Sequence, residues 1–251
     1  MQIKQSAPWA LTGCLLISAA MGVRADVKVV QTTTLVNAQY AQMAESMTAK
    51  QKAAAHRAGM DLMMGVPQVS TVYMSGQHLR VDAAGHYVVY DTAASTQTTV
   101  NIASKTYTTV STAGMIGRAG AFQATVIPAK KHSVILGHPA TAYFLKATSV
   151  SFPGQLISGE IWSADDIRRP NLPSSGILSQ FASLLQQFKG LPLTINLKIT
   201  GTSAGEIDVH SKVISISKAI LPASTFRVPA GYKAGDPNAA PGNPFGGLGG
   251  M

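Results

Sequence analysis

Hydrophobic and polar residues alternate with a period of two along most of the chain after residue 26. The clearest run goes from Leu193 to Ile199, where every second residue is Leu or Ile and the residues between are polar. Successive side chains of a strand point to opposite faces, so this pattern predicts strands with one buried face. Similar runs, rich in Thr, Val, Ile and Tyr, predict further strands at residues 27–36, 70–82, 86–92, 97–102, 106–111, 133–148 and 155–163. Turn signals separate the strands and helices do not alternate with them, so we expect an antiparallel sheet.

Residues 206–216 keep this alternation but change its phase. Ile207, Val209 and Val213 share one face, whereas Ile214 and Ile216 fall on positions that were polar before. One extra residue in a strand, a β-bulge, produces such a shift and bends the strand. The sequence therefore predicts a bulge at this point, in a sheet that curls.

Two segments have the period of a helix instead. In the first, Thr48 and Gln51 form a capping box, in which each side chain satisfies an exposed backbone amide of the first turn. An alanine-rich run follows to Met64, and Gly65 and Pro67 are stop signals. The segment 40–66 is thus expected to be a helical insertion between the first strand and the next.

In the second, Ser174 or Ser175 begins a helix that ends at Lys189, and one apolar stripe runs along its length. In one interpretation the apolar stripes of both helices pack on the sheet and complete the core. In the other they plug the mouth of an open barrel and move to admit an apolar ligand, a role that suits the adaptable Met side chain. Under the second interpretation the ligand or lid contacts are Met60, Met63, Met64, Ile177, Phe181, Leu184, Leu185 and Phe188.

The first 25 residues have the features of a secretory signal peptide. Lys4 supplies a positive start, an apolar run goes from Leu11 to Val23, and Ala25 stands just before the expected cut. We therefore expect a mature chain that starts at Asp26 and is periplasmic or secreted. The apolar run is too short and too interrupted for a membrane span, which needs about 20 continuous apolar residues.

The segment Leu11 to Cys14 resembles a lipobox, the site at which bacterial lipoproteins are cleaved and acylated. A lipoprotein leader places its apolar core before the cysteine, whereas here most of the apolar run follows Cys14. We therefore favour cleavage after Ala25 over a lipid anchor. Since Cys14 is the only cysteine, the mature chain is expected to hold no disulfide and no cysteine metal site.

Composition narrows the class of partner. The full chain carries a net charge of +9, but its Lys and Arg are scattered, with doublets only at 130–131 and 168–169. A nucleic-acid binder concentrates such residues in one patch, so no nucleic-acid partner is expected. Residues 233–251 are rich in Gly and Pro and poor in large apolar residues, and we expect them to lack fixed structure.

No motif marks an enzyme. The sequence has no G-x-S-x-G elbow, no H-E-x-x-H and no glycine-rich nucleotide loop. His78, Asp82 and His86 have the types of zinc ligands. The glycines around them predict a hairpin, which places His86 across the turn from the other two, so we do not favour a metal site. We predict no catalytic residue, no cofactor and no metal.

The order of several short motifs resembles a bacterial family of unknown function that is similar to the periplasmic lipoprotein carriers (LolA/LolB-like). The first motif runs from Tyr73 to Asp82 as a strand, a Gly turn and an Arg, and the others lie at 89–91, 105–107, 135–138, 159–162 and 229–232. The resemblance implies an open antiparallel half-barrel closed by helices. It also implies binding of lipid or acyl chains, or envelope sensing through protein contacts. It assigns no binding residue here.

The sequence thus predicts an α+β, mainly β protein with a single domain at residues 26–232, a curved antiparallel half-barrel capped by one or two amphipathic helices. The expected function is non-enzymatic binding of a lipid or other apolar ligand in the cell envelope. The alternative is a module that binds or senses an envelope protein without a small ligand. An enzyme ranks third.

Overall fold

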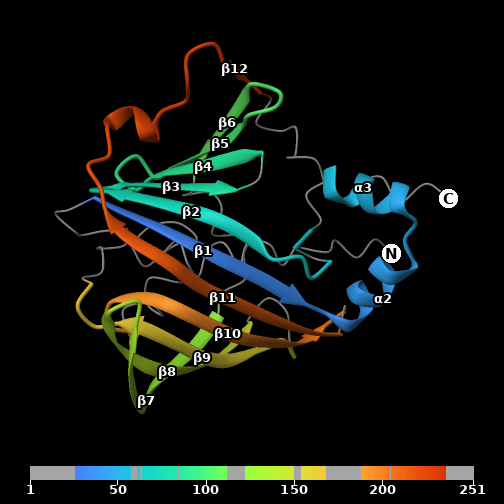
Figure 1. Cartoon of the computed structure of the whole chain (residues 1–251), viewed down its shortest axis with the longest axis vertical. Helices are drawn as coiled ribbons and strands as arrows, with labels where there is room; N and C mark the ends of the chain where they lie inside the picture. The colour runs from blue at the N-terminus through green and yellow to red at the C-terminus, as the bar shows by residue number, and fades with distance from the viewer. Residues whose placement is uncertain are drawn as a thin grey trace.

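The computed structural model describes residues 26–57, 61–62, 64–83, 85–111, 122–149, 154–167, 188–203 and 205–235. They form one open, curved sheet with two α-helices (Figure 1). Most predicted strands are present within a residue or two. In the first half of the chain the elements are β1 (Val27–Val36), α2 (Ala38–Ser46), α3 (Ala49–Arg57), β2 (Gln68–Ser75), β3 (His78–Ala83), β4 (His86–Asp91), β5 (Thr96–Asn101) and β6 (Thr106–Ser111).

The second half of the chain completes the same sheet. Its elements are β7 (Phe122–Ile135), β8 (His138–Ser149), β9 (Leu156–Ala164), β10 (Leu191–Thr202), β11 (Gly205–Lys218), the short 3-10 helix η2 (Ala223–Phe226) and β12 (Lys233–Ala234). The strand order is β12-β6-β5-β4-β3-β2-β1-β11-β10-β9-β8-β7. Neighbours are antiparallel throughout, except that β12 runs parallel to β6. The first strand therefore lies in the interior of the sheet, between β2 and the late strand β11.

Three predicted boundaries change. The segment 133–148, predicted as one strand, contains a tight turn at Leu136–Gly137, and the segment 70–82 divides at Gly76, the glycine turn of the first motif. The backbone φ is positive at both turns. Lys233 and Ala234, at the start of the segment expected to lack structure, instead pair with β6.

The helical insertion divides into two helices. Asn37 caps α2 with its side chain, which accepts a hydrogen bond of 3.0 Å from Tyr40 N. The predicted capping box is present at α3: Thr48 N donates to Gln51 Oε1 at 2.8 Å, and Gln51 N donates back to Thr48 Oγ1 at 3.3 Å. The described helix ends at Arg57, short of the predicted end at Met64.

The predicted bulge is also present. In the pairing of β1 with β11, Val30 lies opposite Ser215 and Gln31 lies opposite Val213, so Ile214 has no partner position. Beyond it Ile216 packs on the same cluster as Val213, as the change of phase requires. A larger irregularity interrupts β7. Three residues of β7 lie between Pro128 and His132, whereas only one residue of β8 lies between their partners Tyr143 and Thr141.

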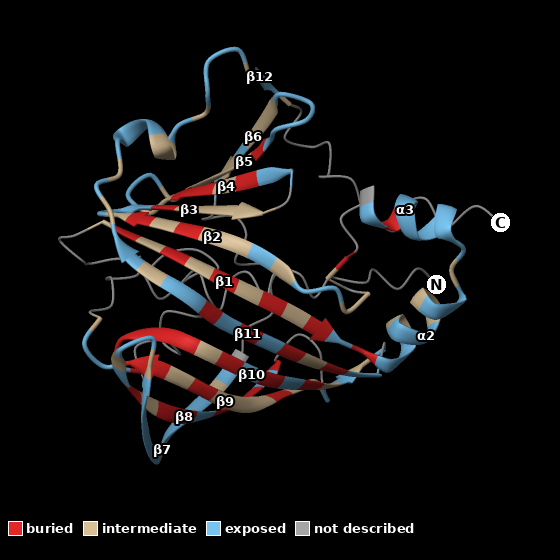
Figure 2. Cartoon of the chain, viewed as in Figure 1, coloured by how far each residue is buried: buried red, intermediate tan, exposed pale blue. Residues whose placement is uncertain are grey.

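One face of the sheet, which we call the inner face, carries the main core. One cluster on it includes Leu79 and Tyr90 of β3 and β4, Val29 of β1 and Val213 of β11. The alternation of buried and half-buried residues along β1 is visible in Figure 2.

The opposite face, the outer face, is covered over β3–β6 by the segment after β11. Phe226, Val228 and Tyr232 pack there on Tyr87 and on its neighbours Val89 and Val100. Buried residues consequently occur on both faces of β4, which is why its sequence reads as a continuous apolar run rather than an alternating one.

Candidate functional site

The inner face carries the two larger clusters of buried apolar residues among the described strands. Its first half lies over β7–β11 and includes Leu145, Ile161, Leu197 and Val209. Its second half lies toward β2–β4 and includes Val29, Val72 and Leu79, together with residues from β10 and β11. All these side chains are buried. No charged side chain points inward from residues 27–35 of β1 or from residues 207–213 of β11.

A short polar band separates the two halves. It consists of Gln31 and Thr33 on β1 and Ser211 on β11, all buried and all on the inner face by alternation. Thr33 Oγ1 and Ser211 Oγ lie 3.0 Å apart, and Ser211 Oγ also donates to the Thr32 carbonyl at 3.3 Å. The two hydroxyls therefore satisfy each other and one backbone group.

Gln31 differs from its two neighbours in this band. The residue is 6% exposed, and no hydrogen bond joins its side-chain amide to any described residue. A buried amide without a partner costs about 1–3 kcal/mol in folding free energy, and native proteins keep few such groups. Gln31 thus offers two donors and one acceptor in the middle of an apolar face.

Of the eight residues predicted as ligand or lid contacts, the structure describes two. Phe188 is fully buried at 0% exposure and packs edge-on against Tyr143, with ring centroids 5.4 Å apart. Its neighbour Lys189 donates from its backbone N to the Tyr143 hydroxyl at 3.3 Å and accepts from Ser163 Oγ through its carbonyl. Phe188 therefore lies on the inner face, against the first half.

Met64 is half-buried in the turn that follows Asp61, where Met64 N donates to the Asp61 carbonyl at 3.1 Å. Leu62 in the same turn and Tyr40 of α2 pack on the first half of the inner face. Burial raises the pKa of the Tyr40 hydroxyl. The other six predicted contacts lie outside the described residues: Met60, Met63, Ile177, Phe181, Leu184 and Leu185.

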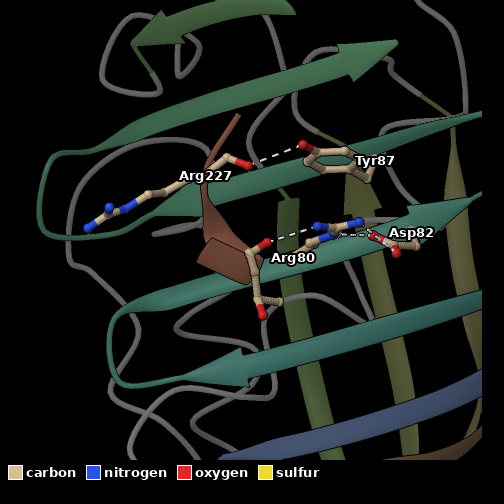
Figure 3. A network of polar contacts seen from close by, with 5 residues as sticks. Arg80, Asp82, Tyr87 and Arg227 are labelled. Carbon is tan, nitrogen blue, oxygen red and sulfur yellow. Dashed lines mark hydrogen bonds and ion pairs between the residues drawn. The ribbon is translucent and has the colours of Figure 1, made fainter. Parts of the chain in front are cut away.

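The most connected polar cluster lies on the outer face, under η2 (Figure 3). Arg80 Nη2 donates to Asp82 Oδ2 at 3.0 Å, and Arg80 Nη1 donates to the Thr225 carbonyl at 2.9 Å. The same guanidinium lies 3.7 Å from the ring centroid of Tyr87, whose hydroxyl donates to the Arg227 carbonyl at 3.2 Å. Burial raises the pKa of Tyr87 against the opposing effect of Arg80. These contacts fasten the segment after β11 to the sheet.

The possible zinc ligands do not converge. Asp82 is paired with Arg80, whereas the ring of His78 stacks on Phe226 at 5.6 Å and lies 3.7 Å from an Asp91 oxygen. Within the part of the chain that the structure describes, no three His, Cys, Asp or Glu side chains are close enough to hold a metal ion.

A second polar group lies on the outer face of β7–β9. Lys131 Nζ donates to Glu160 Oε1 at 2.8 Å, and Trp162 Nε1 donates to Glu160 Oε2 at 3.0 Å. The hydrogen bond from Lys131 lowers the pKa of Glu160, and that from Trp162 adds to the effect. Lys131 also lies 5.4 Å from the ring centroid of Phe144.

The described chain is thus an α+β protein built on a single open, curved antiparallel sheet. None of its described helices is both long and apolar enough to cross a bilayer. No protein-family model matches the sequence, and no curated protein is similar to it.

Solved structures that are similar in shape include the following two. PNGF-II has a TM-score of 0.41 and 12% identity, over 84% of this chain and 31% of that one, so the chain spans about a third of its length. A LolA superfamily protein from Nitrosomonas europaea has a TM-score of 0.35 and 9% identity, over 86% of this chain and 97% of that one. The second belongs to the superfamily that the sequence motifs resemble, but the similarity is weak. At these scores neither structure carries an argument about function.

Proposed function

We propose that the chain is an exported, non-enzymatic protein that binds a lipid or other apolar ligand against the inner face of its sheet. The observation that carries the proposal is the extent of the apolar inner face, which runs from β4 to β8. Its side chains are buried in the ligand-free chain, so binding requires that residues packed on this face, such as Leu62 and Phe188, move aside. Burial of apolar area stabilises a complex by about 25 cal/mol per Å², so an acyl chain covering 200 Å² gains about 5 kcal/mol. Export rests on the features of residues 1–25.

The test compares two adjacent residues of β8 that face opposite ways. Leu145 is buried on the inner face, and Phe144 is 47% exposed on the outer face. In the chain starting at Asp26, we expect Leu145→Ser to weaken binding of a dansylated C11 fatty acid at least fivefold, and Phe144→Ser to leave it unchanged. Thermal unfolding of both variants separates lost binding from lost fold. A wild-type protein that binds no dansylated fatty acid and yields no co-purified lipid by mass spectrometry would refute the proposal.

An envelope interaction module is the second candidate, and one observation favours it. Ile127 on the edge strand β7 lies opposite Phe144 of β8, and both are exposed, at 57% and 47%. Exposed apolar pairs on a sheet edge are found at protein-binding sites. Under this function Phe144→Ser, rather than Leu145→Ser, would abolish capture of the partner.

A further inference from the structure

We infer that the inner face recognises a neutral acyl ester or amide, and that Gln31 is the residue that binds its carbonyl group. This inference rests on the proposed function and names the chemical class of its ligand. The starting observation is the buried side-chain amide of Gln31, which no described residue satisfies. A ligand atom that accepts a hydrogen bond there would remove the cost of the unpaired donors.

The position of the band along the sheet sets the shape of the ligand. On β1 the inward residues on one side of Gln31 are Val27 and Val29, which belong to the second half of the inner face. On the other side, past Thr33, Leu35 belongs to the first half. A ligand that lies along this face therefore meets apolar residues, then a hydrogen-bonding group, then apolar residues again. An ester or amide linkage with an apolar arm on each side has this order of groups.

The absence of charge in the band argues for a neutral group. Thr33 and Ser211 flank Gln31 with hydroxyls, and the inward positions of β1 and β11 around them hold no Lys, Arg, Asp or Glu. A buried carboxylate or ammonium without a charged partner is strongly disfavoured, whereas a neutral carbonyl needs only hydrogen-bond donors. The Gln31 NH2 group supplies these, and the lone pairs left on Thr33 Oγ1 can accept from an amide N–H.

The test uses two ligands of similar length that differ in the linkage. Methyl palmitate and heptadecane, both delivered from cyclodextrin, compete with the dansylated fatty acid for the wild-type chain. We expect methyl palmitate to bind about tenfold more tightly than heptadecane, the factor expected for one or two neutral hydrogen bonds. Gln31→Met keeps the length of the side chain but removes the amide. We expect the variant to bind methyl palmitate and heptadecane equally well and to bind heptadecane as tightly as the wild type does.

The matched control is Thr34→Val, at a half-buried position on the same strand that faces the other way; it should keep the tenfold preference. Gln31→Leu provides a second variant should Gln31→Met not fold, and the ligand-free melting temperature of either is expected to rise, because an unpaired buried amide has been removed. Equal binding of the two ligands by the wild type, or an unchanged preference in the folded Gln31 variants, overturns the inference while the proposed function stands. Failure of both ligands and of the dansylated probe to bind overturns both.

Discussion

Substitution of Arg80 by Met should release the segment after β11 from the outer face. The change removes the two hydrogen bonds to Asp82, the one to the Thr225 carbonyl and the contact with the Tyr87 ring. Hydrogen bonds to charged groups contribute about 1.5–3 kcal/mol and a cation–π contact about 0.5–2 kcal/mol. The side chains of Arg80 and Asp82 are 20% and 31% exposed, so water screens these contacts in part and the expected loss falls below their simple sum, at about 3 kcal/mol.

Two measurements read out this loss. Urea unfolding gives the change in stability, and native-state hydrogen exchange reports whether the amides of residues 225–235 lose protection before those of the sheet. Arg227→Met is the matched control, because it removes the same charge from an exposed side chain whose carbonyl alone makes the contact with Tyr87. It should change stability by less than about 0.5 kcal/mol.

A double-mutant cycle that combines Arg80→Met with Asp82→Asn isolates the interaction between the two side chains, for which we expect a coupling free energy of about 1–2 kcal/mol. The reasoning is refuted if Arg80→Met and Arg227→Met destabilise equally, or if the amides of 225–235 stay protected when Arg80 is absent.

Three further predictions concern the backbone, the inner face and pH. Gly190 has a φ of +73°, and a Cβ there would lie 1.3 Å from the carbonyl oxygen of Ala164, so Gly190→Ala should destabilise the fold by more than about 4 kcal/mol and block folding. Gly76→Ala places its Cβ in open space and should cost only about 1 kcal/mol of stability. Thermal unfolding of the two variants measures the difference. Phe188→Ala should destabilise by about 3–5 kcal/mol through the cavity it leaves, and a loss below 1 kcal/mol would contradict its burial. The pKa of Glu160 is lowered in the folded state, so its contribution to stability is present above its unfolded pKa of about 4.3 and is lost as pH falls through the lower folded value. Lys131→Met should therefore move the pH midpoint of the Trp162 fluorescence change, which follows protonation of Glu160, to higher pH. It should also make the free energy of unfolding fall less steeply below pH about 4.3. An unchanged midpoint would exclude the ion pair between Lys131 and Glu160.

Local patterns in the sequence were enough to predict most of the strands, the capping box and the bulge, but not the first part of β7 (Phe122–Ile135). Each depends on residues near one another in the chain: the phase change at Ile214 is visible in the strand itself, and Thr48 and Gln51 are three residues apart. The inner face was also expected to be apolar, since alternation assigns its residues. These features follow from the periods of backbone structure.

The features that sequence did not predict depend on distant partners. Gln31 and Thr33 are polar residues in a strand, and nothing local shows that Thr33 pairs with Ser211, which lies 178 residues after it. The cover of β3–β6 likewise brings Thr225 to Arg80 across 145 residues. A break in the inward alternation of β1, where two polar residues replace apolar ones, was the available signal for the polar band.

The place of β1 in the sheet has a consequence for how the chain folds. The strand nearest the N-terminus pairs with β11, so one of its two hydrogen-bonded edges stays open until residues 205–218 have been synthesised. Pairings of such high contact order form slowly, because the entropy of closing a long loop must be overcome first. The half-barrel thus cannot close until most of the chain has been made. Under the export that we propose, this late pairing would help to keep the sheet from assembling before the chain crosses the membrane.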